Sequence, residues 1–333
     1  MTRAAPLPDS FRVAVVGAGI SGLACASTLK ARGARVVVYE ASRRPGGRAA
    51  TEVTPVGRFD YGAQYFTAES SDFESWVTAW RDDGLVERWT AQVIALEGGR
   101  TLDKTASAER YIVRDGMQAL GRKLGADLDV RLDSAVASVG RRGSSWDLLD
   151  AGGRSLSHGG FDALVIAVPQ PTELLRRAPE LAQQASSIVW QPCWAVLLAF
   201  EPASGFEFGG VFVNDHPALS WATREDTKGP ATGGIERWVL HATPRWSALH
   251  LNHGADEVAE TLAQAFATRF NFGFRPTLLS ARRWLTATPA NPLKSPYLWD
   301  AGQKIGAVGD WCGGPRLEGA FLSGRALGHA IVA

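Results

Sequence analysis

A glycine-rich turn between a short apolar strand and a helix constrains this 333-residue chain more than any other feature. The apolar segment Arg12–Val16 is typical of a buried strand, and a helix is predicted over Ile20–Ala31. In such a strand–turn–helix the first glycine permits a tight turn, the second lets a pyrophosphate approach the backbone, and the third lets helix and strand pack closely. The turn consists of Gly17, Ala18, Gly19, Ile20, Ser21 and Gly22.

An acidic residue at the end of the next strand makes this motif more specific. The segment Arg35–Tyr39 is apolar and β-branched, as expected of a parallel strand covered on both faces. Glu40 follows directly, where a carboxylate accepts hydrogen bonds from both ribose hydroxyls and disfavours a 2′-phosphate. The free N–H groups at the start of the helix would face the phosphates. Because an ordinary turn leaves Glu40 unexplained, the sequence predicts a dinucleotide site.

The charge balance argues against nucleic acid and membrane partners. Lys and Arg total 35 and Asp and Glu total 34, so there is no basic excess for DNA, RNA or anionic lipid. The apolar stretch Val13–Leu29 is interrupted by three glycines and followed by Lys30, which favours a buried strand and helix over a signal peptide. We expect a soluble, cytoplasmic protein, and the sequence leaves its oligomeric state open.

Cysteine and histidine usage indicates no metal site. Cys25, Cys193 and Cys312 are far apart and form no Cys-x-x-Cys motif, which argues against a disulfide framework and a cysteine-ligated zinc ion. His250 and His253 lie three residues apart, but no further ligand pattern accompanies them. We therefore expect no bound metal.

The segments beyond Glu40 differ from those of an NAD-binding domain, which would continue with further βα units. They include Arg43-Arg44-Pro45-Gly46-Gly47-Arg48, Asp60-Tyr61-Gly62-Ala63-Gln64-Tyr65-Phe66-Thr67, Gly309-Asp310 and Arg316-Leu317-Glu318-Gly319-Ala320. With these blocks the sequence resembles the FAD-dependent amine oxidase superfamily, and most closely its bacterial renalase-like oxidoreductases. The matching blocks are a minor part of the chain.

The resemblance implies a non-covalently bound FAD, held in part by residues along its nucleotide half. Gly47 and Arg48 would lie along the pyrophosphate and the ribityl chain. Gly309 and Asp310 would hold the ribityl or pyrophosphate end, and the backbone of Val136 would meet the adenine.

The resemblance also places two short segments at the flavin ring. The first would lie beside the isoalloxazine through Gly62, Ala63, Gln64 and Tyr65. The second would border the pyrimidine ring through Leu317, Glu318 and Gly319. A helix predicted over Leu317–Ile331 would direct its positive end to the flavin edge on which charge accumulates. Cys312, although close to Asp310, is expected to be packed rather than linked to the flavin.

The layout predicts an α/β protein with a Rossmann-like FAD-binding domain of the glutathione-reductase/amine-oxidase type, assembled from separated segments. We assign residues 1–70, 109–170 and 300–333 to it, including buried strands at Ala163–Val168 and Ile305–Val308 and antiparallel strands over Val130–Leu149. Residues 71–108 and 171–299 would form an inserted α+β substrate domain with a mainly antiparallel sheet.

The predicted substrate domain is rich in tryptophan and balanced in charge. Residues 171–299 contain eleven basic and eleven acidic residues, so no excess of acid indicates a polyamine substrate. By resemblance, Trp284 and His241 come from stretches that face the flavin, and we assign them, with Gln64 and Tyr65, as catalytic candidates. His241 alternatively is a core histidine with satisfied hydrogen bonds. Because these residues come from three distant segments, their convergence is a test of the assignment.

The resemblance implies an oxidase of isomeric dihydronicotinamides, the 2- and 6-dihydro forms of NAD(P). Hydride transfer to the flavin would be followed by passage of electrons to O₂, giving H₂O₂. No His/Asp pair has a spacing that indicates a catalytic base, which favours substrates that release a hydride without one. Two alternatives stay open: an amine oxidase or desaturase acting on a small amine or ring compound, and a flavin-binding sensor or scaffold without turnover.

Overall fold

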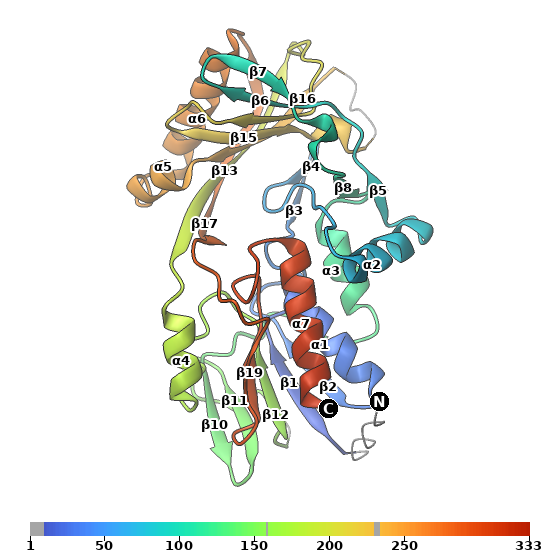
Figure 1. Cartoon of the computed structure of the whole chain (residues 1–333). Coiled ribbons are helices and arrows are strands. Elements are labelled where there is room, and N and C mark those ends of the chain that lie inside the picture. The colour runs from blue at the N-terminus through green and yellow to red at the C-terminus, as the bar shows by residue number, and fades with distance from the viewer. Residues whose placement is uncertain (1–9, 158, 230–233) are drawn as a thin grey trace. The chain divides into compact units, whose positions relative to one another are not determined.

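The computed structural model describes residues 10–157, 159–229 and 234–333, and the chain divides into two compact units (Figure 1). Unit 1 comprises Met1–Arg48, Leu120–Val189 and Pro289–Ala333, and unit 2 comprises Ala49–Ala119 and Trp190–Thr288. These boundaries differ from the domain assignment made from the sequence. Residues 49–70 and 109–119 lie in unit 2, because Asp60 is hydrogen-bonded there to Met117 and Glu225. Residues 171–189 and 289–299 lie in unit 1.

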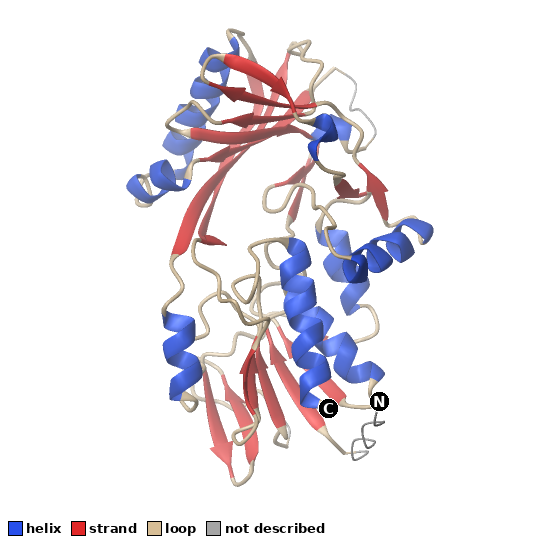
Figure 2. Cartoon of the chain, viewed as in Figure 1, coloured by secondary structure: helices blue, strands red, loops and turns tan. Residues whose placement is uncertain are grey.

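Unit 1 is built on a six-stranded sheet with the order β18-β19-β12-β1-β2-β9 (Figure 2). The strands are β1 (Arg12–Val16), β2 (Arg35–Tyr39), β9 (Asp129–Arg131), β12 (Ala163–Ile166), β18 (Leu298–Asp300) and β19 (Ile305–Ala307). Only the β18–β19 pair is antiparallel. The central strand β1 is apolar and buried on both sides, with Ala14 aligned to Val37 of β2 and Leu164 of β12. The predicted Rossmann-like α/β architecture is confirmed.

Two helices of unit 1 lie side by side through small residues (Figure 1). They are α1 (Ile20–Ala31) and α7 (Leu317–Ile331), both with the predicted bounds. A Cβ atom at Gly324 would lie 2.0 Å from the carbonyl oxygen of Ser21, and one at Gly328 would lie 2.8 Å from the Cβ atom of Thr28. The glycines of α7 are therefore required for this close approach.

The rest of unit 1 departs from the sequence prediction in one stretch. We expected antiparallel strands throughout Val130–Leu149, but β9 pairs in parallel with β2 at the edge of the main sheet. Only β10 (Ser138–Arg142) and β11 (Ser145–Leu149) form an antiparallel hairpin. Two helices complete the region, α3 (Gln118–Gly125), which crosses the boundary between the units in sequence, and α4 (Pro179–Ser186).

Unit 2 contains a seven-stranded sheet with the order β17-β13-β16-β15-β14-β6-β7. Its strands are β6 (Val93–Glu97), β7 (Arg100–Asp103), β13 (Trp190–Glu201), β14 (Gly210–Val213), β15 (Leu219–Arg224), β16 (Glu236–Ala242) and β17 (Arg275–Pro289). The described neighbouring pairs are antiparallel except β14–β6. This agrees with the expected mainly antiparallel sheet.

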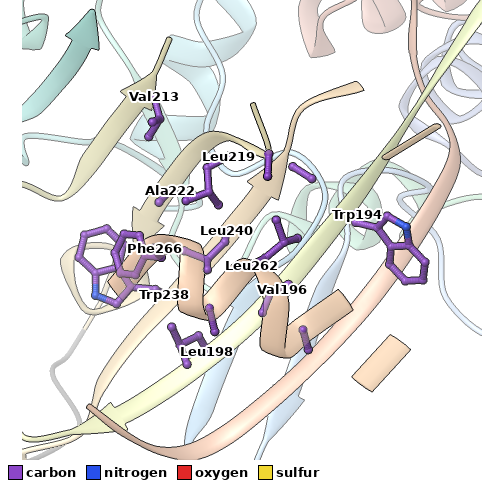
Figure 3. Close-up of a cluster of buried hydrophobic side chains, with 14 of the residues drawn as sticks. Trp194, Val196, Leu198, Val213, Leu219, Ala222, Trp238, Leu240, Leu262 and Phe266 are labelled. Atoms are coloured by element: carbon purple, nitrogen blue, oxygen red, sulfur yellow. The ribbon is translucent and has the colours of Figure 1, made fainter. Parts of the chain in front are cut away.

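Helix α6 (Ala255–Phe270) covers one face of this sheet (Figure 3). Leu262 and Phe266 of α6 pack against Trp238 and Leu240 of β16. Since side chains of a strand alternate between faces, Val239 and His241 lie on the opposite face. Their cross-strand partners there are Thr223 and Trp221 of β15. The alternation thus leaves a second face of the sheet for the site described below.

Smaller elements complete unit 2. They are the antiparallel pairs β3 (Thr51–Thr54) with β4 (Gly57–Asp60) and β5 (Val86–Arg88) with β8 (Tyr111–Val113), the helices α2 (Ser71–Asp82) and α5 (Pro244–Leu249), and the 3₁₀ turns η1 (Thr105–Ser107) and η2 (Glu225–Thr227). Helix α2 is amphipathic, with Phe73, Val77 and Trp80 buried. Ser70 caps its N-terminus by accepting a hydrogen bond from the backbone N–H of Phe73.

Candidate functional site

The glycine turn between β1 and α1 has the geometry that the motif predicts. Gly17 has φ +104°, a conformation that favours glycine, and a Cβ atom at Gly22 would lie 2.0 Å from the Gly17 carbonyl oxygen. A Cβ atom at Gly19 would meet no atom within 4 Å, so the backbone at that residue is open on one side. Ile20 and Ser21 begin α1 and are buried. The turn therefore fits a phosphate group beside the start of α1.

Glu40 follows β2 and lies beside this turn. One carboxylate oxygen accepts a hydrogen bond from the Ala18 N–H (2.7 Å), and the other accepts one from the Ser42 N–H (2.9 Å). Glu40 also lines a cavity of about 320 Å³ together with Gly17 and Val136. Three of the residues predicted to hold the nucleotide thus border one cavity, whose size lies in the range of small-molecule sites.

Three of the remaining predicted nucleotide residues, Gly47, Arg48 and Asp310, lie next to the turn or pair with each other. The Gly46 N–H donates to the Ala18 carbonyl oxygen, and Gly47, with φ +58°, lies against Gly19. Arg48 and Asp310 form a bidentate ion pair with distances of 2.8 and 2.5 Å. Asp310 is 7% exposed, so this pair joins two distant segments in a partly buried setting. Sequence reasoning assigned both residues to the cofactor but did not predict that they pair.

The last of the predicted cofactor residues are Gly309, which follows β19, and three residues in the first turn of α7. The Gly309 N–H donates to the Ser323 hydroxyl (3.0 Å), which fixes the segment after β19 to this helix. A Cβ atom at Gly319 would lie 2.3 Å from the Gly314 carbonyl oxygen, and Glu318 is buried. Leu317 begins the helix as predicted. Their roles toward a flavin ring stay predictions.

Unit 2 brings the four catalytic candidates together around Tyr61. Nε2 of Gln64 lies 3.3 Å from Nε2 of His241, and that ring nitrogen lies 3.3 Å from the carbonyl oxygen of Tyr61. The indole N–H of Trp284 donates to the same carbonyl oxygen (3.0 Å). Tyr65 follows Gln64 in the same loop. The convergence expected from three distant segments is therefore present in the fold.

Aromatic rings flank these polar groups. Tyr61 stacks on Trp284, with ring centroids 5.3 Å apart and an interplanar angle of 16°. Tyr65 stacks on Trp89 with ring centroids 5.8 Å apart, and packs at a tilt against Trp221 at 5.5 Å. Two aromatic groups of this kind suit a flat ring as ligand. Gly62 and Ala63, which connect Tyr61 to Gln64, are partly exposed.

The environment keeps His241 neutral. Burial, with a smaller contribution from the Lys228 ammonium, lowers the pKa of His241 from 6.5 to about 4. None of the hydrogen bonds that the described residues make to Gln64, Tyr65, His241 or Trp284 comes from a carboxylate. The groups hydrogen-bonded to Gln64, His241 and Trp284 are therefore uncharged at neutral pH.

A buried cluster of charged side chains, connected to Gln64 through Thr223, was not predicted from the sequence. The ammonium group of Lys228 lies 2.6 Å from Glu225 and 3.8 Å from Asp60, and all three residues are buried. The backbone N–H of Asp60 donates to Glu225, and Thr223 lies between Glu225 and Gln64. Asp60, Glu225 and Lys228 also border a second cavity of about 150 Å³. The available signal was Glu225 and Lys228, three residues apart, directly after the apolar strand β15.

Three further properties of the described residues bear on the site. They contain no group of three or more His, Cys, Asp or Glu side chains that could hold a metal ion. None of their helices has both the length and the apolarity that crossing a membrane requires. Burial raises the pKa of the Cys312 thiol, which disfavours the thiolate that a covalent flavin link would need.

Comparison with known proteins agrees with this geometry. A sequence family described as "NAD(P)-binding Rossmann-like domain" matches residues 15–82. The chain is 36% identical over 109 residues to protoporphyrinogen oxidase 2 of Arabidopsis thaliana, covering 33% of this chain and 18% of that protein. It is 38% identical over 82 residues to a neurosporene-forming phytoene desaturase of Cereibacter sphaeroides, covering 25% and 16%. The matches span less than a fifth of these relatives' length.

Similarity to solved structures extends over nearly the whole chain. A protein described as a protoporphyrinogen oxidase from Exiguobacterium sp. 255-15 superposes with a TM-score of 0.78 at 15% identity, covering 97% of this chain and 98% of that one. Cyclohexylamine oxidase from Brevibacterium oxydans IH-35A gives 0.69 at 15% identity, covering 97% and 99%. A putrescine oxidase gives 0.70 at 14% identity, covering 97% and 99%.

These similarities and the glycine turn between β1 and α1 together support FAD as the cofactor. The chain is thus an α/β protein with a Rossmann-like NAD(P)-binding domain and the fold of the FAD-dependent amine and protoporphyrinogen oxidases.

Proposed function

We propose that the chain is an FAD-dependent oxidoreductase, renalase-like in specificity, that oxidises the 2- and 6-dihydro isomers of NAD(P) with O₂ as electron acceptor. In this reaction the dihydropyridine ring loses a hydride, which is one proton with two electrons, and becomes NAD(P)⁺. O₂ takes up the two electrons, the proton of the hydride and one further proton from solvent to give H₂O₂. When bound, FAD would supply the two-electron acceptor for the ring.

Unit 1 supports a dinucleotide of the FAD type. Glu40 and Val136 line the cavity beside the glycine turn, which supports their expected roles at the ribose and the adenine, and an acid at Glu40 disfavours a 2′-phosphate. After β2 the chain does not form the next βα unit that an NAD-binding domain would have. It instead enters unit 2, and the sheet continues only at β9.

The single observation that carries the substrate assignment is the neutral aromatic group formed by Gln64, His241, Tyr61 and Trp284. A flat, neutral dihydropyridine can stack on the Tyr61–Trp284 pair and needs no base to release a hydride. A substrate bound as an ammonium ion would need a charged partner, and no carboxylate is hydrogen-bonded to the side chains of Gln64, His241 or Trp284 among the described residues. Positioning by stacking and a few hydrogen bonds then supplies the reaction geometry.

Amine oxidation is the second candidate, because putrescine oxidase and cyclohexylamine oxidase have a similar fold. The test is aerobic turnover of the FAD-loaded protein, with O₂ uptake, H₂O₂ and NAD(P)⁺ measured in the same sample. We expect one H₂O₂ per NAD(P)⁺ with 2- or 6-dihydro-NAD(P), and no turnover with putrescine or cyclohexylamine. Turnover of the amines alone would replace the proposal with amine oxidation. Bound FAD that no substrate reduces would indicate a sensor or scaffold.

A further inference from the structure

The side chain of Gln64 sits at the centre of a chain of hydrogen bonds. Its Oε1 lies 2.5 Å from the indole nitrogen of Trp221 and 2.6 Å from the hydroxyl of Thr223. Its Nε2 lies 3.3 Å from Nε2 of His241. Gln64 is 3% exposed, so these protein groups, and not solvent, satisfy its amide.

Trp221 decides which way this amide faces. An indole N–H is a donor only, so the atom that lies against it must be the amide oxygen. A turned amide would set its NH₂ group against the Trp221 N–H and leave two buried donors without acceptors. The NH₂ group of Gln64 is therefore the one that faces His241.

The direction of the amide in turn fixes the proton on His241. If Nε2 of His241 carried the proton, two donors would face each other and the buried NH₂ group of Gln64 would have no acceptor. If Nε2 carries a lone pair, it accepts from Gln64, and the Tyr61 carbonyl oxygen keeps the Trp284 N–H as its donor. The second arrangement gives the buried NH₂ group of Gln64 an acceptor. Its proton then lies on Nδ1, which has no hydrogen-bond partner among the described residues.

We propose that Trp221, acting through Gln64, holds His241 as the neutral tautomer with its proton on Nδ1, and that this N–H donates to a hydrogen-bond acceptor on the ligand. Trp221 and Gln64 are positioning residues in this account, and His241 is the residue that contacts the ligand. The inference rests on the proposed function only for the identity of the ligand.

The hydrogen bonds of Thr223, on the far side of Gln64 from His241, support the same orientation of the Gln64 amide. Since Gln64 presents its oxygen, the single hydroxyl proton of Thr223 must go to Gln64 and not to Glu225, which lies 3.4 Å away. Glu225 does not depend on that proton, because the Lys228 ammonium (2.6 Å) and the Asp60 N–H (3.0 Å) already donate to its two oxygens. The buried charged cluster thus leaves Thr223 free to hold the amide oxygen. Burial, which lowers the pKa of His241 to about 4, agrees with a neutral ring.

A donor at this position selects among substrates. A neutral N–H beside the Tyr61–Trp284 stack favours a flat ring that carries a carbonyl acceptor, such as a carboxamide. It cannot accept a hydrogen bond from an ammonium group. The substrate class is therefore an aromatic-like ring with an acceptor substituent.

The first test reads the tautomer of His241 directly. The full chain, loaded with FAD and labelled with ¹⁵N in its histidine rings, is studied at pH 7 by long-range ¹H–¹⁵N correlation, and the His241→Gln variant assigns the signals. We expect the Nδ1–H tautomer in the wild type. Trp221→Phe should allow the Nε2–H tautomer, because the Thr223 hydroxyl accepts as well as it donates. Gln64→Glu should enforce an Nε2–H, because a carboxylate cannot donate.

Trp89→Phe is the matched control. Trp89 belongs to the same aromatic group around Tyr65, but its N–H donates to Thr227 and not to Gln64. It should leave the Nδ1–H tautomer in place. An Nε2–H tautomer or an imidazolium in the wild type overturns the proposal, and so does a Trp221→Phe spectrum that keeps the wild-type tautomer.

The second test measures ligand preference with two probes, nicotinamide and 3-methylpyridine, titrated against the oxidised holoprotein by flavin absorbance. One added neutral hydrogen bond predicts that nicotinamide binds about tenfold more tightly. The preference should be lost in Trp221→Phe and kept in Trp89→Phe. Equal affinities in the wild type would overturn the ligand contact. Failure of the proposed function appears separately, as absent FAD or absent turnover, since neither test requires a reaction.

Discussion

Replacement of Glu40 by alanine tests the nucleotide half of the site. The carboxylate accepts backbone hydrogen bonds from Ala18 and Ser42 and lines the cavity beside the glycine turn. A hydrogen bond to a charged group contributes about 1.5–3 kcal/mol, so loss of one ribose acceptor should weaken FAD binding by roughly 10- to 150-fold. Loss of the two backbone bonds should also lower the free energy of unfolding. Because Glu40 is partly exposed, we expect a loss of FAD affinity near the lower end of this range, roughly tenfold.

The assay is titration of the FAD-free protein with FAD, followed by quenching of flavin fluorescence at a temperature where wild type and variant are both folded. Glu173→Ala is the matched control, because Glu173 is an exposed acid that lines the same cavity and pairs with Arg176. It should bind FAD nearly as tightly as the wild type. A Glu40→Ala variant with the wild-type dissociation constant would refute the ribose contact, whatever happens to its stability.

Four other predictions have defined outcomes. Gly324→Ala should lower the free energy of unfolding by about 1–3 kcal/mol in denaturant titrations, because its Cβ atom would lie 2.0 Å from Ser21 O; an unchanged midpoint would contradict the packing of α1 on α7. Burial raises the pKa of Glu225 from 4.5 to about 6, so its stabilising contribution is complete below pH 4.5 and is lost as the pH rises through 6. Glu225→Gln should remove that fall from the stability–pH profile, and an identical profile would contradict it. His241 acts in the opposite sense: its pKa of about 4 gives stability above pH 6.5 that is lost as the pH falls toward 4. Trp284→Ala should slow flavin reduction in stopped-flow mixing while FAD stays bound, and an unchanged rate would remove Trp284 from the site.

The nucleotide-binding half was largely predictable because its determinants are local. Gly17, Gly22 and Glu40 lie within one βαβ unit, where glycine spacing and an acid after the second strand have a direct geometric meaning. The bounds of α1 and α7 were also predicted from the sequence. The pairing of Arg48 with Asp310 could not be predicted from the sequence, since the two residues are far apart in it and each was assigned separately to the cofactor.

The substrate half was less predictable because its contacts cross the sheet of unit 2. Sequence reasoning named Gln64, His241 and Trp284 through resemblance, but their geometry depends on the register of β15 against β16. A shift of one residue would turn His241 to the face covered by α6. The charged cluster at Lys228 was missed for the same reason, since Asp60 is distant in sequence from Glu225 and Lys228. The domain boundaries also differed, because β4 belongs to unit 2 through the buried contacts of Asp60.

Anaerobic single-turnover reduction of the bound flavin tests the central claim most directly. The FAD-loaded protein is mixed without O₂ with 2-dihydro-NAD(P), 6-dihydro-NAD(P), putrescine or cyclohexylamine, and the loss of flavin absorbance is followed while NAD(P)⁺ is measured. The account predicts rapid bleaching with the dihydronicotinamide isomers, one NAD(P)⁺ per flavin, and none with the amines. Purified protein that binds no FAD, or bound flavin that only the amines bleach, would contradict it.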